Sequence, residues 1–459
     1  MYQQLVEEKG KICSYERFRK ALRNANVSFA RLGQEECEIC IAFTSMSADA
    51  VHQVCRSARG VLAMSHWTAM VEGGPVRVNH AAVVIEDTIL SFGGYCAAEF
   101  DPHNPDKAMD IHAFSTETLQ WTKQPVPEYR ADHPSSPPFL RYGHTATEYA
   151  GAAYIFGGRN EASVCNRLYR YDPYVDKWSR IAHGGMIPNA RDGHAATRHG
   201  HCLYVHGGYD NDMEEFSRDL FRYDFREGVW HACALCDRWE GMHRDFHALS
   251  TVGDKLYLFG GKSDELEPYY SNRPVYDNHL YVYDPAAERW DRREAKGEAP
   301  GGRRIVIDGK LYTFGGLNCL AGEHYNTVHR YDPAQNRWRL LRPHGRPPPV
   351  RRRAVACVHN GKAYIFGGTS PLIGSPMPAK SPAEEEDEPP LVDHSDLHVL
   401  EICPPLRTLA MNQVMRSKVP IRPLPLAIRR EVDHLRRSQS IFVRQRYGAQ
   451  RPPLSDRHQ

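Results

Sequence analysis

Short hydrophobic runs recur along the chain, and each of them ends at a pair of glycines. Ala153–Phe156 stands before Gly157-Gly158, and Leu256–Phe259 stands before Gly260-Gly261. The six glycine pairs that end such runs begin at residues 93, 157, 207, 260, 315 and 367, so successive pairs of this kind are 64, 50, 53, 55 and 52 residues apart. A strand-like segment that recurs about every 50 residues predicts one propeller blade per repeat.

A second kind of run, in which hydrophobic and polar residues alternate, follows most of these pairs and ends in aspartate. Leu168–Asp172 and Leu280–Asp284 are examples, and a tryptophan comes six residues after each such aspartate, at Trp178, Trp230, Trp290 and Trp338. In the first repeat Trp121 follows Ser115 by the same interval. Alternation with a period of two between turn residues indicates strands, four in each repeat.

An arginine stands sixteen residues before the first glycine of five pairs, and in the first four repeats a histidine follows it by three residues. These residues are Arg77, Arg141, Arg191, Arg244 and Arg351, with His80, His144, His194 and His247. We interpret them as structural residues that satisfy backbone groups between blades. In the fifth repeat Arg303 is only twelve residues before Gly315, which predicts the loss of four residues from the first turn and strand.

These motifs resemble the kelch repeat family over residues 66–402. The resemblance implies an all-β fold, a six-bladed kelch β-propeller at residues 64–402 with a short C-terminal helical tail. The sixth repeat ends at Ser395–Leu400 without a tryptophan strand, whereas His66–Val71 supplies one before the first repeat. We expect His66–Val71 to complete the sixth blade, because closure of the ring leaves no open sheet edge.

Composition excludes several classes of protein. No hydrophobic run approaches the roughly 18 residues of a membrane span, so we expect no membrane partner. The twelve cysteines are scattered along the chain, which suits reduced thiols and predicts the cytoplasm and the nucleus. No enzyme motif is present, so we expect a binding surface without catalytic residues and without a cofactor.

The strand order predicts where a ligand would bind. The Arg-x-x-His turns and the residues after the glycine pairs should share one rim of the propeller, because antiparallel strands join them. The candidate residues combine aromatic rings with charges: Asn79, Tyr95, Tyr142, Arg159, Asp192, Tyr209, Asp245, Phe246, Lys262, Arg303 and Arg304. Such a set suits a pocket for a peptide or a protein terminus, and a solvated rim without function is the alternative.

The segment after the propeller has the pattern of an amphipathic helix. Leu406, Leu409, Ala410 and Val414 lie on one helical face, and a second short helix is expected from Ile428 to about Leu435. By its pattern alone, the first helix docks either on the propeller or on a partner protein.

The same segment resembles an elongin-binding box, Leu406–Val414, followed by a cullin box with Leu424, Pro425 and Ile428. A kelch propeller with these boxes is similar to the kelch-repeat substrate receptor family of cullin-2 RING ubiquitin ligases. The resemblance implies a non-enzymatic adaptor whose tail binds elongin B/C and cullin-2. It also implies that the propeller captures C-terminal degrons that end in glycine.

The chain departs from this family at three places. The family has cysteine at the position of Ala410, and we expect the smaller side chain to weaken elongin docking by about 1 kcal/mol. The family's two carboxylate-binding arginines align with Lys262 and Glu265, and its serine falls in the gap of the fifth repeat. Lys262, Arg303 and Arg304 offer replacement charge, while Asp192 and Asp245 fit a basic residue before the terminal glycine.

The remaining segments give weaker predictions. Residues 1–63 share no repeat signal and are either a small zinc module, with Cys37, Cys40, His52 and Cys55 as ligands, or a fused or mispredicted segment. Residues 370–392 are expected to form a disordered acidic and proline-rich insert in blade six, residues 403–435 the helical box segment, and residues 436–459 a basic flexible tail. The competing function is a kelch scaffold that associates with chromatin through this tail.

Overall fold

The computed structural model describes residues 65–97, 107–131, 133–233, 242–271, 273–300, 303–307, 310–318, 323–372, 390–402 and 429. The chain divides into two compact units. The larger is Val71–Arg342 with Arg346–Val399, and the smaller is Met1–Met70, Pro343–Gly345 and Leu400–Gln459. Of the smaller unit, only residues 65–70, 343–345, 400–402 and 429 are described. No α-helix forms among the described residues of the larger unit.

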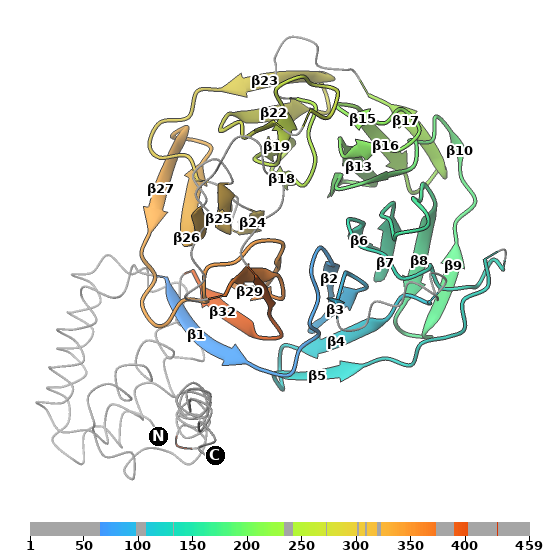
Figure 1. Ribbon diagram of the computed structural model, residues 1–459, viewed down its shortest axis with the longest axis horizontal. Helices are drawn as coiled ribbons and strands as arrows, with labels where there is room; N and C mark the ends of the chain where they lie inside the picture. Colours follow the sequence, from blue (N-terminus) through green and yellow to red (C-terminus); the bar gives the residue numbers. More distant parts are fainter. Residues whose placement is uncertain are drawn as a thin grey trace, which may run out of the picture. The chain divides into compact units, whose positions relative to one another are not determined.

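Six antiparallel sheets form the ring that Figure 1 shows face-on, which confirms an all-β propeller. The first sheet holds β2 (Ala81–Ile85), β3 (Thr88–Phe92), β4 (Ile111–Ser115) and β5 (Gln120–Lys123). The second holds β6 (Thr145–Tyr149), β7 (Ala152–Phe156), β8 (Leu168–Asp172) and β9 (Lys177–Arg180). The third holds β12 (Ala195–His199), β13 (Cys202–His206), β16 (Leu220–Asp224) and β17 (Val229–Ala232), and β10 (Gly184–Gly185) adds a parallel edge strand beside β17.

The other three sheets repeat this order. The fourth holds β18 (Ala248–Val252), β19 (Lys255–Phe259), β22 (Leu280–Asp284) and β23 (Arg289–Arg293). The fifth holds β24 (Arg303–Ile307), β25 (Lys310–Asn318), β26 (Glu323–Asp332) and β27 (Arg337–Leu341). The sixth runs β28 (Val355–His359), β29 (Lys362–Phe366), β32 (Leu397–Glu401) and β1 (His66–Val71), which confirms that the strand before the first repeat completes the last blade.

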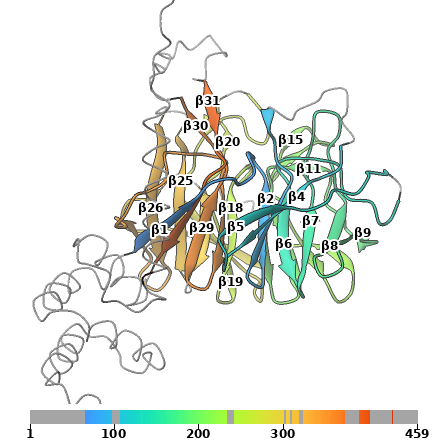
Figure 2. The ribbon, with the colours of Figure 1, turned by 90° about the horizontal axis from the view of Figure 1, so that it is seen from below.

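Shorter strand pairs stand on one face of the ring. They are β11 (Arg191–Asp192) with β14 (Tyr209–Asp210) and β15 (Glu215–Phe216), β20 (Ser263–Asp264) with β21 (Pro274–Val275), and β30 (Thr369–Pro371) with β31 (Leu391–Asp393). Seen edge-on in Figure 2, β11, β15, β20, β30 and β31 lie along the same side. We call this side the rim face.

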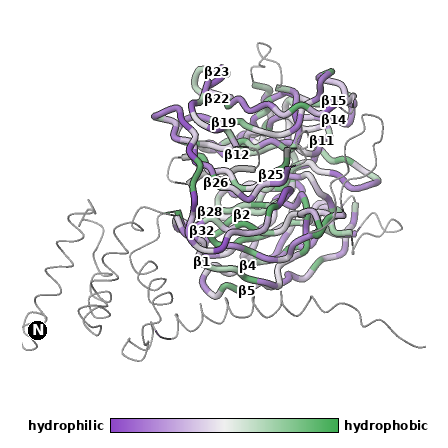
Figure 3. Tube along the Cα trace, turned by 60° about the vertical axis from the view of Figure 1, so that its left-hand side comes forward, coloured by the Kyte–Doolittle hydropathy of each residue, from purple (hydrophilic) through white to green (hydrophobic). Residues whose placement is uncertain are grey.

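Tryptophans and phenylalanines join neighbouring blades in the core. Trp230 packs on Tyr223 of its own blade at 5.2 Å and on Phe156 of the preceding blade at 5.1 Å between ring centroids. Trp338 contacts Phe259 of the preceding blade in the same way, at 5.1 Å. Figure 3 shows the corresponding hydrophobic stretches in green within the strands. The repeated tryptophan of the sequence therefore packs one blade against the preceding one.

The fifth blade corrects one prediction from the sequence. β24 pairs with β25 from Arg303–Phe314 to Ile307–Lys310, the same register as Ala81–Phe92 to Ile85–Thr88 in the first blade. The first strand is therefore complete, and the expectation that the deletion reaches into it is wrong. Counted back along the sequence from Arg303, Ala and Gly stand at residues 299 and 302, where the other repeats have the motif's arginine and histidine. The fifth blade lacks the motif and keeps the strand.

Candidate binding face of the propeller

Turn residues and residues that follow the glycine pairs meet on the rim face. The pairs are Val78 with Tyr95, Tyr142 with Arg159, Asp192 with Tyr209, Asp245 with Lys262, and Arg352 with Thr369. Both backbone bonds form between Tyr142 and Arg159, at 2.9 Å each. The candidate residues of these five blades thus share one face, as the strand order predicts. Their role in binding stays a prediction.

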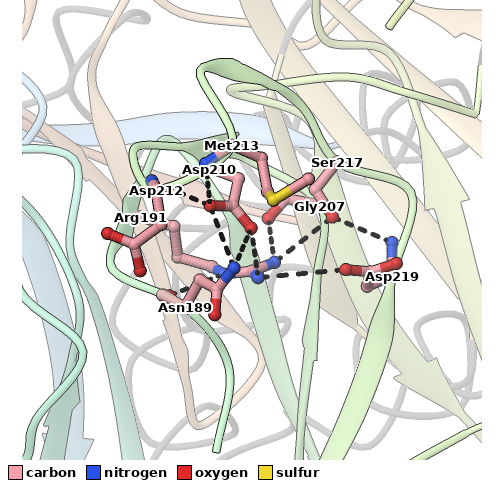
Figure 4. Close-up of polar contacts among 8 residues, drawn as sticks. All are labelled: Asn189, Arg191, Gly207, Asp210, Asp212, Met213, Ser217 and Asp219. Atoms are coloured by element: carbon pink, nitrogen blue, oxygen red, sulfur yellow. Dashed lines mark hydrogen bonds and ion pairs between the residues drawn. The ribbon is translucent and has the colours of Figure 1, made fainter.

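The buried side chains of the motif arginines hydrogen-bond the backbone at the glycine pairs next to this face. Figure 4 shows Arg191 among its partners: its guanidinium donates to the carbonyl of Gly207 at 3.1 Å and to the Asp210 carboxylate at 3.3 Å. Arg244 and Arg351 donate in the same way to Gly260 and Gly367. Arg191, Arg244 and Arg351 therefore satisfy the first glycine's carbonyl within their own blade, and not between blades as expected.

The motif histidine is the residue that reaches across blades. The ring of His144 hydrogen-bonds the carbonyl of Phe92 in the preceding blade at 3.1 Å. Burial lowers the pKa of His144 to about 3, and the charge of Arg141 adds to this effect, so the ring is neutral at physiological pH. The structural interpretation of the histidine is confirmed at this position.

Backbone hydrogen bonds join the third residue of one Arg-x-x-His turn to the third residue of the turn in the neighbouring blade. Gly143 donates to Asn79, Gly193 to Gly143, Phe246 to Gly193, and Asn79 to Arg353, over 2.6–3.3 Å. Asn79 and Phe246 also line the cavity at the mouth of the central channel, beside the first residues of the inner strands. These bonds fix the turns that carry the candidate side chains, so the face is preorganised for a ligand.

Two buried carboxylates lie among cations on this face. Burial raises the pKa of Asp192 to about 6, against the opposing charges of Arg159 and Lys262. Burial likewise raises the pKa of Asp245 to about 7, where Lys262 opposes the shift and Asp192 adds to it. Both side chains are 7% exposed. The Oδ1 atom of Asp245 and the Nε atom of Arg159 are buried without a hydrogen-bond partner, so the face holds an unsatisfied acceptor and an unsatisfied donor at these two residues.

Aromatic rings surround these charges. Tyr95 and Tyr142 pack edge to face at 6.0 Å. The Lys262 ammonium lies over the rings of Phe216, at 5.4 Å, and Tyr270, at 5.0 Å. Sequence reasoning missed Phe216 and Tyr270, because they lie in the loops after the glycine pairs, outside the repeated positions.

Comparisons with known proteins agree with this architecture. The family model KLHDC2/KLHL20/DRC7 Kelch-repeats domain matches residues 143–368. Kelch domain-containing protein 3 of Bos taurus is 36% identical over 390 residues, which cover 82% of this chain and 98% of that protein, and the human protein gives the same figures. The chain belongs to the kelch domain-containing protein 3 family. Host cell factor 2 of Homo sapiens is a more distant relative, 28% identical over 52% of this chain and 31% of its own length.

Membership of the kelch domain-containing protein 3 family supports a role in protein interaction, as a binding module. Among the described residues, no group of three His, Cys, Asp or Glu side chains could hold a metal ion. In the same part of the chain, no helix is long and hydrophobic enough to cross a membrane.

Where the family is expected to have its second arginine, the structure shows Glu265. This carboxylate is exposed and pairs with Arg273 at 3.2 Å. Arg303 and Arg304 begin the inner strand β24, at the register positions of Ala81 and Ala82 in blade one. They are therefore residues of an inner blade strand, whereas the other candidates lie in the turns, loops and short strands of the rim face.

Several predicted residues lie outside the described part of the chain. These are the elongin-box residues Leu406, Leu409, Ala410 and Val414, the cullin-box residues Leu424, Pro425 and Ile428, and the zinc candidates Cys37, Cys40, His52 and Cys55. The prediction of a disordered insert at residues 370–392 is wrong at both ends, because Thr369–Pro371 and Leu391–Asp393 pair as β30 and β31, while residues 373–389 lie outside the described part. Arg429, within the second expected tail helix, is helical.

Proposed function

We propose that this chain is the substrate-recognition adaptor of a cullin-2 RING ubiquitin ligase, acting in the cytoplasm and nucleus on proteins with glycine-ended C-terminal degrons. The observation that carries the proposal is the pair of unsatisfied buried atoms on the rim face, the donor Nε of Arg159 and the acceptor Oδ1 of Asp245. A peptide terminus presents the complementary groups, a carboxylate and adjacent N–H donors. Family membership gives the propeller a role in protein interaction.

In this proposal Arg159 and Lys262 receive the terminal carboxylate. Burial raises the pKa of Asp192 and the charges of Arg159 and Lys262 both oppose that rise, so the two cations share Asp192 as an electrostatic neighbour. Asp192 and Asp245 then receive a basic side chain next to the terminal glycine, and ionise as it binds because an opposite charge lowers their raised pKa values. Tyr95 and Tyr142 supply aromatic contact area beside them.

The tail completes the adaptor. Leu406, Leu409, Ala410 and Val414 would bind elongin B/C, and Leu424, Pro425 and Ile428 would bind cullin-2, as the resemblance of this segment implies. No catalytic residue is required, because the ligase's RING component recruits the ubiquitin-charged enzyme.

Co-purification with elongin B/C and cullin-2 tests the proposal. We expect the wild-type chain to capture both, Leu406→Ser to lose them, and Thr408→Ser, on the other side of the expected helix, to keep them. Failure of the folded wild-type chain to capture either partner would refute the adaptor role. It would favour the kelch scaffold. Residues 416–459 hold eleven Arg and Lys against three Asp and Glu, and this positive charge would attract the scaffold's partners.

A further inference from the structure

Two loops of the rim face, from blades three and four, form a joined surface beside Lys262. The blade-three loop is the hairpin of β14 and β15, and the blade-four loop runs from β20 to β21. Phe216 of the first loop donates its N–H to the carbonyl of Pro268 in the second at 2.8 Å, and its ring packs on Tyr270 at 6.0 Å. The loops are therefore one unit.

A buried aspartate organises each loop. Asp210 accepts from the backbone N–H groups of Asp212 and Met213 at the hairpin tip and is itself held by Arg191, as Figure 4 shows. Asp264 accepts from the N–H groups of Leu266 and Ser271, at 3.0 and 2.8 Å. Backbone fixed in this way loses little conformational entropy on binding, so the loops can present side chains at low cost.

The side chains that these loops present are large and mostly hydrophobic. Met213, Leu266, Tyr269 and Tyr270 are 61%, 60%, 65% and 55% exposed. Single exposed hydrophobic residues are ordinary, but four on two joined loops indicate an interaction surface. Tyrosine in particular combines a large contact area with few rotatable bonds.

Lys262 connects this surface to the candidate pocket, by which we mean Arg159, Asp192 and Asp245, the residues that receive the peptide terminus in the proposed function. Its backbone pairs with Asp245, while its ammonium lies over Phe216 and Tyr270 at the edge of the loops. A peptide whose carboxylate reaches Lys262 must continue away from the pocket, and these loops are the adjacent surface. Because the loop surface is continuous with the pocket, we infer that the same substrate peptide occupies both.

We propose that Met213, Leu266, Tyr269 and Tyr270 form a platform that binds hydrophobic side chains of the substrate a few residues before its C-terminus. The inference rests on the proposed function and adds a second determinant to it, an apolar position upstream of the glycine end. Substrates that share the same terminal residues would then differ in affinity according to this position.

Fluorescence anisotropy with the full chain and three ten-residue peptides tests the platform. All three end in Arg-Gly: one has Leu and Phe four and six residues from the end, one has Ser at both places, and one is the Leu/Phe peptide as a C-terminal amide. We expect wild type to bind the Leu/Phe acid about tenfold more tightly than the Ser acid. Leu266→Ser and Tyr269→Ser, which leave the Lys262 contacts intact, should reduce this ratio below about twofold.

Val175→Ser is the matched control, because Val175 is 66% exposed in the turn after β8, at the end of the blade opposite to the rim face. It should keep the wild-type ratio of the two affinities.

Equal binding of the Leu/Phe and Ser acids by wild type would overturn the platform while leaving carboxylate recognition in place. Equal binding of acid and amide would overturn carboxylate recognition, while the platform would stand on the Leu/Phe to Ser ratio. Binding by none of the peptides would overturn both. A wild-type dimer that Leu266→Ser disperses would assign the surface to a second copy.

Discussion

Gly94 donates its backbone N–H to the carbonyl oxygen of Arg141 at 2.8 Å, and this bond ties the end of one blade to the turn of the next. The same bond recurs around the ring, from Gly158 to Arg191, Gly208 to Arg244, Gly316 to Arg351 and Gly368 to Arg77. The second glycine of the pair is thus the connection between blades. The motif arginine supplies its acceptor while its own side chain binds elsewhere.

Gly94→Ala should destabilise the propeller by about 3 kcal/mol. The residue has a φ of +98°, and an added Cβ would lie 2.6 Å from the Cβ of His80. Gly200→Ala is the control, because Gly200 also has a positive φ, +59°, but an added Cβ would meet no atom within 4 Å, so a loss of about 1 kcal/mol is expected. Urea unfolding of both variants measures the difference, and equal losses would show that the close approach at Gly94 is unimportant.

The blades could be predicted from the sequence because each repeats the same physical requirements. A glycine pair, a motif arginine and an inter-blade tryptophan are each needed for packing, so they recur at fixed spacing, and even β1 could be assigned to the last blade. The rim loops could not be predicted in this way. Phe216, Tyr270 and Asp264 lie in loops that differ in length from blade to blade, so no periodic signal marks them. The fifth blade was misjudged because its motif, and not its strand, is missing.

The pair of Arg351 and Asp396 should be a major support of the sixth blade. Arg351 is buried and binds both carboxylate oxygens, at 2.8 and 3.0 Å, as well as the Gly367 carbonyl. Arg351→Met removes the guanidinium from a largely buried carboxylate, which then keeps the hydrogen bond to His398 at 2.9 Å, and should cost about 3 kcal/mol of unfolding free energy. A double-mutant cycle with Asp396→Asn measures the coupling, and additive losses would contradict a direct role of the pair.

Asp245→Asn should stabilise the fold at pH 8. Burial raises the pKa of Asp245 to about 7, above its unfolded value, so the folded state holds a proton that it loses as the pH rises through 7. Wild type therefore loses stability between about pH 4 and pH 8. The neutral side chain of Asp245→Asn avoids this loss, so the variant should be more stable than wild type by about 1–3 kcal/mol at pH 8. Thermal unfolding at pH 5 and pH 8 checks the sign. A variant no more stable than wild type at pH 8 would show that the charge of Lys262 compensates the burial of the Asp245 carboxylate.

Glu265→Arg should increase the affinity of the rim face for a peptide carboxylate several-fold. The change adds a cation close in sequence to Lys262 and releases Arg273 from its ion pair with Glu265. The gain should appear for a peptide with a free C-terminus and not for its amide, and should decrease at high salt because the site is exposed. Glu227→Arg, in the turn after β16 at the opposite end of its blade, makes the same change of net charge and should leave binding unchanged. Equal gains from both substitutions would show that net charge, and not a carboxylate site beside Lys262, governs the affinity.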